Sequence, residues 1–273
     1  MALGSGLASG QISAYNLLLA APKLQSYAKA MIDVLTINQS IVNELSAAAM
    51  SHLYWGNCLG ILKKIPDLSV HLLVTDPPYA NDYVSRSTTL PLVRIAGNGR
   101  DEAPPLVREA LKLCYQKLQW NTHAYVFCDR WSYEMMKQAA IEAGFTPKNV
   151  LIWYKNNRTR GDLKGNYGYE DEWILFLHKG RRHLFGKRDG NVLPFKKVPS
   201  QYMQHPTEKP VELLKYLIQK SSVPGEVVLD PFAGIGSTGV AALEADRKCI
   251  LMEIQEEWAQ VAAVRTGLPM LAV

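Results

Sequence analysis

Short apolar runs alternate with amphipathic segments along the chain after residue 50. The runs have the length of buried strands, and the segments between them repeat apolar positions at helical spacing. Strands are predicted at 52–56, 70–74, 122–128, 150–154, 172–178, 226–229 and 248–253. Helices are predicted at 59–65, 104–118, 132–143 and 211–220, then from the glycine-rich stretch near 239 to about 245, and finally from 256 onward. The alternation predicts an α/β fold with a doubly wound, mostly parallel sheet.

The first 50 residues do not follow this alternation. Residues 1–10 are rich in Gly and Ser, and 11–50 carry apolar residues at spacings that predict two helices broken near Pro22. We therefore expect a helical N-terminal extension over 1–50 and one α/β domain over 51–273.

Two further stretches are expected to be loops. Residues 81–101 are polar and include two glycines, and 181–204 have neither a helical nor a strand period. A loop as long as 81–101 is more often functional than idle. The helix after the second stretch is expected to carry Pro210 at its first position, where proline is favoured.

Strand 70–74 runs directly into Asp76-Pro77-Pro78-Tyr79. Two prolines cannot continue a strand, so the chain must turn there with a stiff backbone. An acid, a fixed carbonyl and an aromatic ring are then held at the carboxyl end of a strand, where open α/β sheets bind ligands. Taken alone, an Asp-Pro-Pro triplet is more typical of a proline-stiffened turn, and the adjoining Tyr79 and a second site downstream reverse that judgement.

This second site has a glycine pattern between a predicted strand and a helix. Asp230-Pro-Phe-Ala is followed by Gly234, Gly236 and Gly239 in the spacing G-x-G-x-x-G. Such glycines let a ligand approach the backbone, and Glu253 at the end of the next strand is placed to accept hydrogen bonds from a ribose. Asp230 would repel a pyrophosphate but suits a cationic sulfonium or an amino group. S-adenosylmethionine is therefore favoured over a nicotinamide dinucleotide.

The charge is unevenly distributed along the chain. The formal net charge is +5, whereas residues 155–197 alone contain eleven Lys and Arg against five acids. A basic segment on a nearly neutral body is typical of a protein that binds a polyanion. For any single lysine, a solvated loop remains a sufficient explanation.

Composition narrows the class of protein further. The apolar fraction is 48%, no apolar run is long enough to cross a bilayer, and no secretory signal pattern begins the chain. The four cysteines form no C-x-x-C pair, which predicts buried reduced thiols and no metal site. We expect a cytoplasmic protein without membrane or metal partners.

The chain is also similar to a known family, the amino-group DNA methyltransferases that modify N6 of adenine or N4 of cytosine. Asp76-Pro-Pro-Tyr79 resembles their catalytic motif, and Asp230-Pro-Phe-Ala-Gly234 resembles their cofactor motif. The order of the two motifs resembles the circularly permuted beta group. The segment from His205 to Pro210, together with Trp153-x-Lys155 and the strand at Glu172, resembles other regions of the family. The similarity extends from about residue 54 to residue 265.

The resemblance implies an S-adenosylmethionine-dependent methyltransferase fold of Rossmann-like type. It implies double-stranded DNA as substrate, S-adenosylmethionine as cofactor, and catalysis by Asp76, Pro77, Pro78 and Tyr79. The cofactor-binding residues carried over by resemblance are Asn57, Thr207, Lys209, Asp230, Phe232, Ala233, Gly234, Gly236 and Glu253. Asn57 departs from the family, which usually has Asp at this position to contact the adenine of the cofactor. No role is assigned to His205, for which capping of the loop is an equally good explanation.

The basic segment is the candidate for target recognition. We expect residues 179–204 to contact DNA, with these side chains as candidates: Arg181, Arg182, Lys187, Arg188, Lys196 and Lys197. Because the segment is short, a homodimer is one way to complete the grip on DNA. A restriction-modification setting also follows from the resemblance.

The expected reaction explains why these residue types are needed. The lone pair of an exocyclic amine is delocalised into the base, so the Asp76 carboxylate and the Pro77 carbonyl would each accept one N–H and orient the nitrogen. Tyr79 would stack on a base flipped out of the duplex. Asp at position 76 resembles the adenine-modifying members of the family more than the cytosine-modifying ones, so the resemblance implies adenine N6 as the target, with cytosine N4 as the alternative. From other classes, a NAD-dependent oxidoreductase and an inactive nucleic-acid-binding module remain open.

Overall fold

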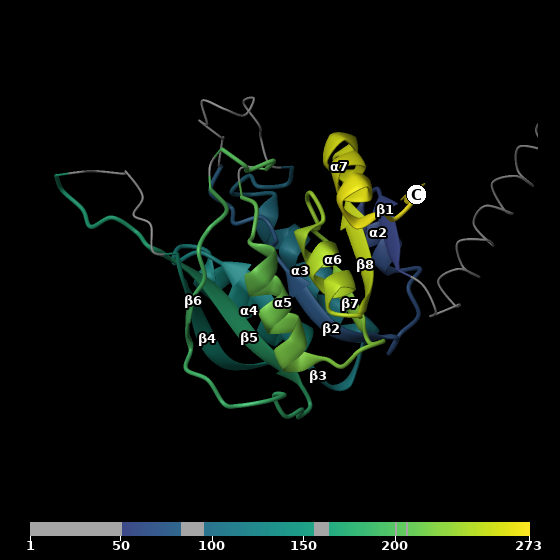
Figure 1. Ribbon diagram of the computed structural model, residues 1–273, viewed down its shortest axis with the longest axis horizontal. Coiled ribbons are helices and arrows are strands. Elements are labelled where there is room, and N and C mark those ends of the chain that lie inside the picture. Colours follow the sequence, from purple (N-terminus) through teal and green to yellow (C-terminus); the bar gives the residue numbers. More distant parts are fainter. Residues whose placement is uncertain (1–50, 83–95, 156–163, 200, 206) are drawn as a thin grey trace, which may run out of the picture. The chain divides into compact units, whose positions relative to one another are not determined.

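The computed structural model describes residues 51–82, 96–155, 164–199, 201–205 and 207–273 (Figure 1). The predicted extension 1–50 and most of the 81–101 loop lie outside the described residues. The described strands are β1 (His52–Trp55), β2 (Val70–Thr75), β3 (Leu118–Cys128), β4 (Thr146–Tyr154), β5 (Asp171–Lys179), β6 (Val192–Pro194), β7 (Val227–Asp230), β8 (Lys248–Glu253) and β9 (Met270–Ala272). The described helices are α2 (Cys58–Leu62), α3 (Ala103–Lys117), α4 (Tyr133–Ala143), α5 (Val211–Ser221), α6 (Ser237–Glu244) and α7 (Glu256–Thr266).

These strands form one sheet in the order β6-β4-β5-β3-β2-β7-β8-β1-β9. Every pairing between these strands is parallel except the two made by β5, which runs antiparallel to both β3 and β4. The predicted mostly parallel sheet is confirmed.

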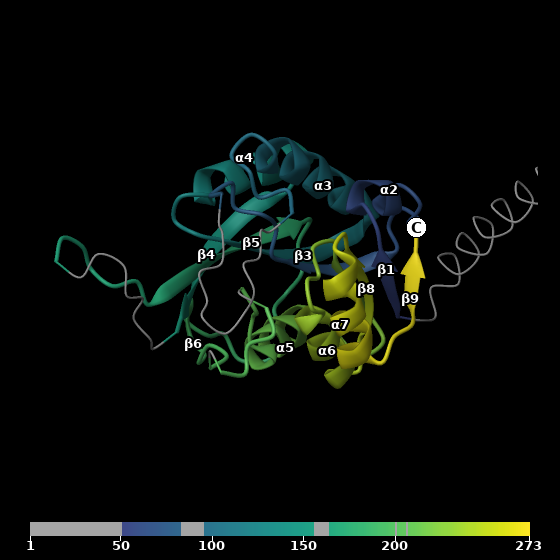
Figure 2. The ribbon, with the colours of Figure 1, turned by 90° about the horizontal axis from the view of Figure 1, so that it is seen from above.

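Helices cover both faces of the sheet, with α2, α3 and α4 on one side and α5, α6 and α7 on the other (Figure 2). Each buries an apolar stripe, as in α5, where Leu213, Leu214, Leu217 and Ile218 are all at most 2% exposed. α4 ends where Gly144 takes the left-handed conformation (φ 108°) that a residue with a side chain adopts at a cost.

The site is positioned by the neighbouring strands β2 and β7. The chain leaves β2 for α3 on one face and leaves β7 for α6 on the other, so the loops after the two strands diverge. This divergence creates the crevice in which doubly wound proteins bind ligands. The Thr75 hydroxyl at the end of β2 donates a 2.8 Å hydrogen bond to Asp230 at the end of β7, which ties the two loops together.

Three local predictions were wrong. The stretch 181–204 contains a short strand, β6, and the chain ends in a further strand, β9, on the outer side of β1. Strands of three residues are too short to show periodicity. Pro210 lies at the N-cap of α5 in an extended conformation (ψ 132°) and not at the first helical position.

Within the part of the chain that the structure describes, no helix is both long and apolar enough to cross a membrane. All four cysteines are buried free thiols, as predicted.

Candidate active site

A cavity of about 680 Å³ opens where the carboxyl ends of the parallel strands meet. It is lined by the loops that follow β1, β2, β3, β4, β7 and β8, and by the amino end of the reversed strand β5. The structure brings most predicted site residues to this cavity: Asn57, Asp76, Pro77, Pro78, Tyr79, Thr207, Lys209, Phe232, Ala233, Gly234 and Glu253 line it. Asp230 is 3% exposed at the end of β7, and Gly236 is the N-cap of α6.

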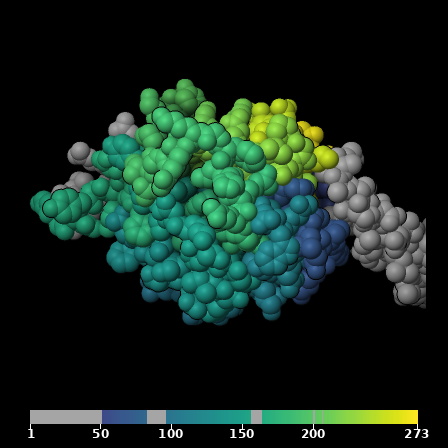
Figure 3. Space-filling model, turned by 90° about the horizontal axis from the view of Figure 1, so that it is seen from below, coloured from purple at the N-terminus to yellow at the C-terminus, as the bar shows by residue number. Residues whose placement is uncertain are grey.

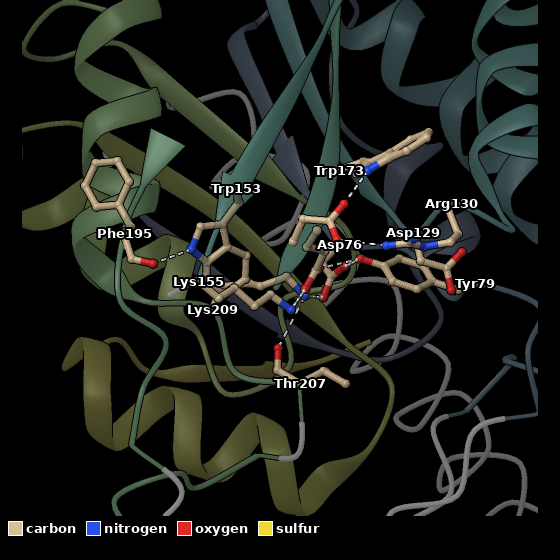
Figure 4. A network of polar contacts seen from close by, with 12 residues as sticks. Asp76, Tyr79, Asp129, Arg130, Trp153, Lys155, Trp173, Phe195, Thr207 and Lys209 are labelled. Carbon is tan, nitrogen blue, oxygen red and sulfur yellow. Dashed lines mark hydrogen bonds and ion pairs between the residues drawn. The ribbon is translucent and has the colours of Figure 1, made fainter. Parts of the chain in front are cut away.

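On the β2 side of the cavity, both oxygens of the Asp76 carboxylate have partners (Figure 4). The Tyr79 hydroxyl lies 2.5 Å from Asp76 Oδ1, and Lys209 Nζ lies 2.5 Å from Oδ2. The family resemblance predicts that Lys209 binds the cofactor. In the structure its side chain is 8% exposed and ion-paired with Asp76, so its present partner belongs to the catalytic motif.

Glu172 and Lys155, which have no individual role in the sequence-based predictions, complete this network. Glu172 Oε1 lies 2.9 Å from both Lys209 Nζ and the Tyr79 hydroxyl, and Lys155 Nζ lies 2.8 Å from Glu172 Oε2. The sequence could have indicated both residues, because Trp153-x-Lys155 and the strand at Glu172 are among the segments that resemble the family. Two carboxylates and two ammonium groups therefore balance one another around the Tyr79 hydroxyl.

Burial and pairing shift the ionisation of this network in opposite directions. Burial raises the pKa of Asp76, and the Lys209 ammonium opposes that shift only in part. Burial also disfavours the charged form of Glu172, but Lys209 and Lys155 outweigh it and hold its pKa at about 2. Burial raises the pKa of the Tyr79 hydroxyl well above its usual value, so the phenol stays neutral and can donate a hydrogen bond.

On the β7 side, the acids are held by backbone N–H groups and hydroxyls. Asp230 Oδ1 accepts from the Thr75 hydroxyl and, at 3.1 Å, from the backbone N–H of Phe232. Glu253 accepts from the backbone N–H groups of Gly234 (2.9 Å) and Gln255 (2.8 Å). Burial raises the pKa of Asp230 to about 6 and also raises the pKa of Glu253.

The glycines of the second motif have separate uses. Gly234 (φ 51°) and Gly236 (φ 77°) are in the left-handed region, which turns the loop from β7 into α6. At Gly239 an added Cβ would lie 2.4 Å from Leu251 Cδ1, so the absence of a side chain lets α6 pack closely on β8.

Asn57 and His205 have structural partners at the rim of the cavity. The Asn57 side chain accepts from the backbone N–H of Leu59 and caps α2. The His205 ring accepts from the backbone N–H of Thr207 at 3.3 Å and packs edge-on against Trp258. This arrangement supports a loop-capping role for His205.

The family described as DNA methylase (N6_N4_Mtase) matches residues 70–264 of the chain. The chain belongs to this family. It is 30% identical to the DNA adenine methyltransferase YhdJ of Escherichia coli over 247 residues, which cover 77% of this chain and 80% of YhdJ.

Solved structures share the fold of this methylase. A crystal structure of an M1.HpyAVI–SAM complex superimposes with a TM-score of 0.64 at 23% identity, over 80% of this chain and 100% of that chain. The PvuII DNA methyltransferase, named as cytosine-N4-specific, superimposes with a TM-score of 0.65 at 18% identity, over 80% and 87% of the two chains. The predicted methyltransferase fold is thus confirmed, whereas the permuted order of the motifs stays a prediction.

The structure divides the predicted DNA-binding residues of the methylase between two edges of the sheet. β5 carries the chain away from the cavity, so Arg181, Arg182, Lys187 and Arg188 follow at the amino edge. Figure 3 shows the molecule from below, with the green segment of the chain at the surface. There the Arg182 guanidinium pairs with Glu226 at 2.8 Å, and the Arg182 carbonyl accepts from His123. β6 then returns toward the cavity, and Lys196 and Lys197 follow it at the carboxyl edge.

An aromatic and cationic rim borders the cavity beyond β3. The Trp131 side chain is 79% exposed and follows Asp129, whose carboxylate accepts its backbone N–H. Next to it, the Arg130 guanidinium lies 2.8 Å from Asp171 and 3.8 Å from the centre of the Tyr169 ring. None of these residues has a role in the sequence-based predictions, because none belongs to a motif.

Among the residues described, no group of three or more His, Cys, Asp or Glu is arranged to hold a metal ion.

Proposed function

We propose that this DNA methylase transfers a methyl group from S-adenosylmethionine to the N6 amine of adenine in double-stranded DNA. The observation that carries the proposal is the Asp76 carboxylate, which lines one cavity with Glu253 above the buried Asp230. Neither Glu253 nor Asp230 is neutralised by a cation in any described contact. Adenine is favoured because position 76 is Asp and because the relative YhdJ is named an adenine methyltransferase.

Asp76 and Pro77 act on the amine, whose nitrogen must be drawn out of conjugation with the ring. The Asp76 carboxylate and the Pro77 carbonyl each accept one N–H and so orient the lone pair. The Tyr79 ring stacks on the target base, which must leave the duplex to enter the cavity. These residues act by positioning and electrostatics.

The β7 side of the cavity fits a nucleoside that carries a positive charge. Glu253 retains acceptor capacity for a ribose hydroxyl beyond its backbone N–H partners Gly234, Gln255 and Ile254, since a carboxylate offers about four acceptor sites. Asp230 lies beneath the loop, Phe232 and Ala233 line the wall, and the left-handed Gly234 leaves the backbone open. S-adenosylmethionine, when bound, supplies an electrophilic methyl group. Thr207 would contact its carboxylate. The Lys209 ammonium has three N–H groups, which lie against Asp76, Glu172 and the Thr207 carbonyl, so it could contact the cofactor only by releasing one of these partners.

We further propose that the duplex lies over the mouth of the cavity. Trp131, Lys196 and Lys197 are at that edge. For the four basic residues at the amino edge, contact with the same stretch of DNA is not proposed. A homodimer remains a prediction.

Incubation with methyl-labelled S-adenosylmethionine and DNA of mixed sequence, followed by digestion to nucleosides, tests the proposal. Label in N6-methyladenine is expected. Label in N4-methylcytosine would replace adenine by the alternative target, and label in no nucleoside would leave the fold without the proposed activity. Family membership already sets aside the NAD-dependent oxidoreductase, and the same experiment decides whether the fold is an inactive DNA-binding module.

A further inference from the structure

Each oxygen of the Asp76 carboxylate already has one donor in the structure. Its Oδ1 is 2.5 Å from the Tyr79 hydroxyl and its Oδ2 is 2.5 Å from Lys209 Nζ. A carboxylate offers about four acceptor sites, so a substrate amine that donates to Asp76 shares an oxygen with a donor already in place, and that donor weakens the oxygen as an acceptor.

The Tyr79 hydroxyl has a second acceptor within reach. Its oxygen is 2.9 Å from Glu172 Oε1, and a phenol has a single proton to donate. Rotation about the C–O bond is enough to move that proton from Asp76 toward Glu172, with the ring left where it is. Lys209 Nζ likewise lies 2.9 Å from the same Glu172 oxygen.

Glu172 is held more firmly than Asp76. It is the second residue of β5, where it stands opposite Trp153 of β4, and the next residue, Trp173, is paired with both β3 and β4. Its other oxygen is 2.8 Å from Lys155 Nζ, which lies over the Trp153 ring. Asp76, in contrast, begins the loop after β2. The fixed carboxylate can thus receive donors that the loop carboxylate gives up.

We propose that Glu172 is a positioning residue that frees Asp76 for the substrate amine, by accepting the Tyr79 hydroxyl and sharing the Lys209 ammonium when the amine binds. The inference rests on the proposed role of Asp76 as the acceptor of the amine. Glu172 itself touches neither base nor cofactor in this arrangement.

A double-mutant cycle between Glu172 and Tyr79 tests the inference. In single turnover with methyl-labelled cofactor, Glu172→Ala should slow transfer about tenfold or more, the scale of one hydrogen bond to a charged group. Tyr79→Phe keeps the stacking ring and removes the competing hydroxyl, so the Glu172→Ala loss should be several-fold smaller in that background. Equal losses in both backgrounds would overturn the proposal.

The pH profile gives a readout that a purely structural role would not move. The Glu172 charge raises the pKa of Asp76. Glu172→Gln keeps an oxygen for the Tyr79 hydroxyl but removes that charge, so it should retain more activity than Glu172→Ala and shift the acid limb of the rate to lower pH. An unshifted limb would contradict the charge-sharing part. If Glu172→Ala does not fold, the cycle is run with Glu172→Gln. A smaller loss in the Tyr79→Phe background then supports the proposal, and equal losses overturn it.

Asp171→Asn is the matched control, because Asp171 is the preceding residue of the same strand and also pairs with a cation at 2.8 Å. It should show neither coupling to Tyr79→Phe nor a shifted acid limb. Failure of the proposed function is recognised separately. A wild-type protein that labels no DNA, or Asp76→Ala that stays active, refutes the function. Active wild type, inactive Asp76→Ala and no coupling refute the inference alone.

Discussion

The loops after β2 and β7 end neighbouring strands, yet their acids are held in different ways. On the β2 side, Asp76 and Glu172 are neutralised by Lys209 and Lys155 through contacts between side chains. On the β7 side, Asp230 and Glu253 accept only from hydroxyls and backbone N–H groups in the described contacts. Neutral donors leave negative charge in the cavity, whereas ammonium groups cancel it.

The difference indicates a division of labour. A site in which acids remain uncompensated is suited to a cation. A site in which each acid shares donors with another acid can exchange partners without exposing an unpaired charge, which is costly when buried. The largest predicted effect therefore comes from the acid that must contact the substrate.

Asp76→Ala should separate the two sides most sharply. Methyl transfer should fall about 10²–10³-fold, the scale of removing one preorganised polar contact to the reacting group. Cofactor affinity, measured by calorimetry, should stay within a few-fold because the β7 side is untouched. A variant that loses cofactor binding together with transfer would show that the two sides are not independent.

Gly239→Ala tests the packing that supports the β7 side. The added Cβ would lie 2.4 Å from Leu251 Cδ1, and overpacking of this kind costs about 1–3 kcal/mol in the free energy of unfolding. Gly60→Ala in α2 is the control, since no atom lies within 4 Å of the added carbon. Denaturant unfolding should show a loss for the first variant and no loss for the second.

Trp131→Ala probes the rim on the opposite side of the cavity. If Trp131 stacks on a base or packs against DNA, binding should weaken by about 1–3 kcal/mol in a titration of labelled duplex. Trp120 is 62% exposed but lies on the part of β3 near the amino edge, so Trp120→Ala should bind DNA normally. Equal weakening by both variants would remove the rim from the interface.

The pKa of about 6 at Asp230 predicts how cofactor binding depends on pH. A cationic ligand favours the ionised form, so its affinity should be about tenfold weaker at pH 5 than at pH 8, and Asp230→Asn should flatten this dependence. Burial raises the pKa of Asp230 in the folded state. The protonated carboxyl therefore contributes fully to the free energy of unfolding below the usual pKa of an Asp, and this contribution is lost as the pH rises through 6. The melting temperature of Asp230→Asn relative to wild type should therefore rise between pH 5 and pH 8.

The smallest effect concerns the two edges of the sheet. Replacing Lys196 and Lys197 by Ala should reduce the slope of log affinity for DNA against log salt, by about 1 for each phosphate that the protein no longer neutralises. The same change at Arg181 and Arg188 should leave the slope unaltered. The reverse result would place the duplex at the amino edge.

The sequence predicted the parts of the fold that depend on local patterns. The strands predicted from the apolar runs, the proline turn after β2 and the glycine turn after β7 all occur where expected. The charge network could not be predicted this way, because Lys209 and Asp76 are 133 residues apart and meet only through the order of the strands. The family resemblance pointed to Lys209, but toward a different partner.

The basic segment shows a second limit. Its positive charge is evident from the sequence, but the edge of the sheet on which each residue lies depends on the direction of β5. A run of apolar and aromatic residues does not show whether a strand is parallel or antiparallel to its neighbours. Arg182 also illustrates that a basic residue in such a segment can belong to an internal ion pair, here with Glu226.

The reversed direction of β5 also determines which connections of the methylase lie near the cavity and which lie far from it. Inserted residues would therefore have different effects in different connections. The connection from β4 to β5 begins and ends at the cavity, so added residues there could reach a substrate. The turn near residues 185–189 lies at the far edge, where Lys220 of α5 contacts it. A reporter protein inserted at that turn should not obstruct DNA. This position is therefore suited to labelling or immobilising the enzyme.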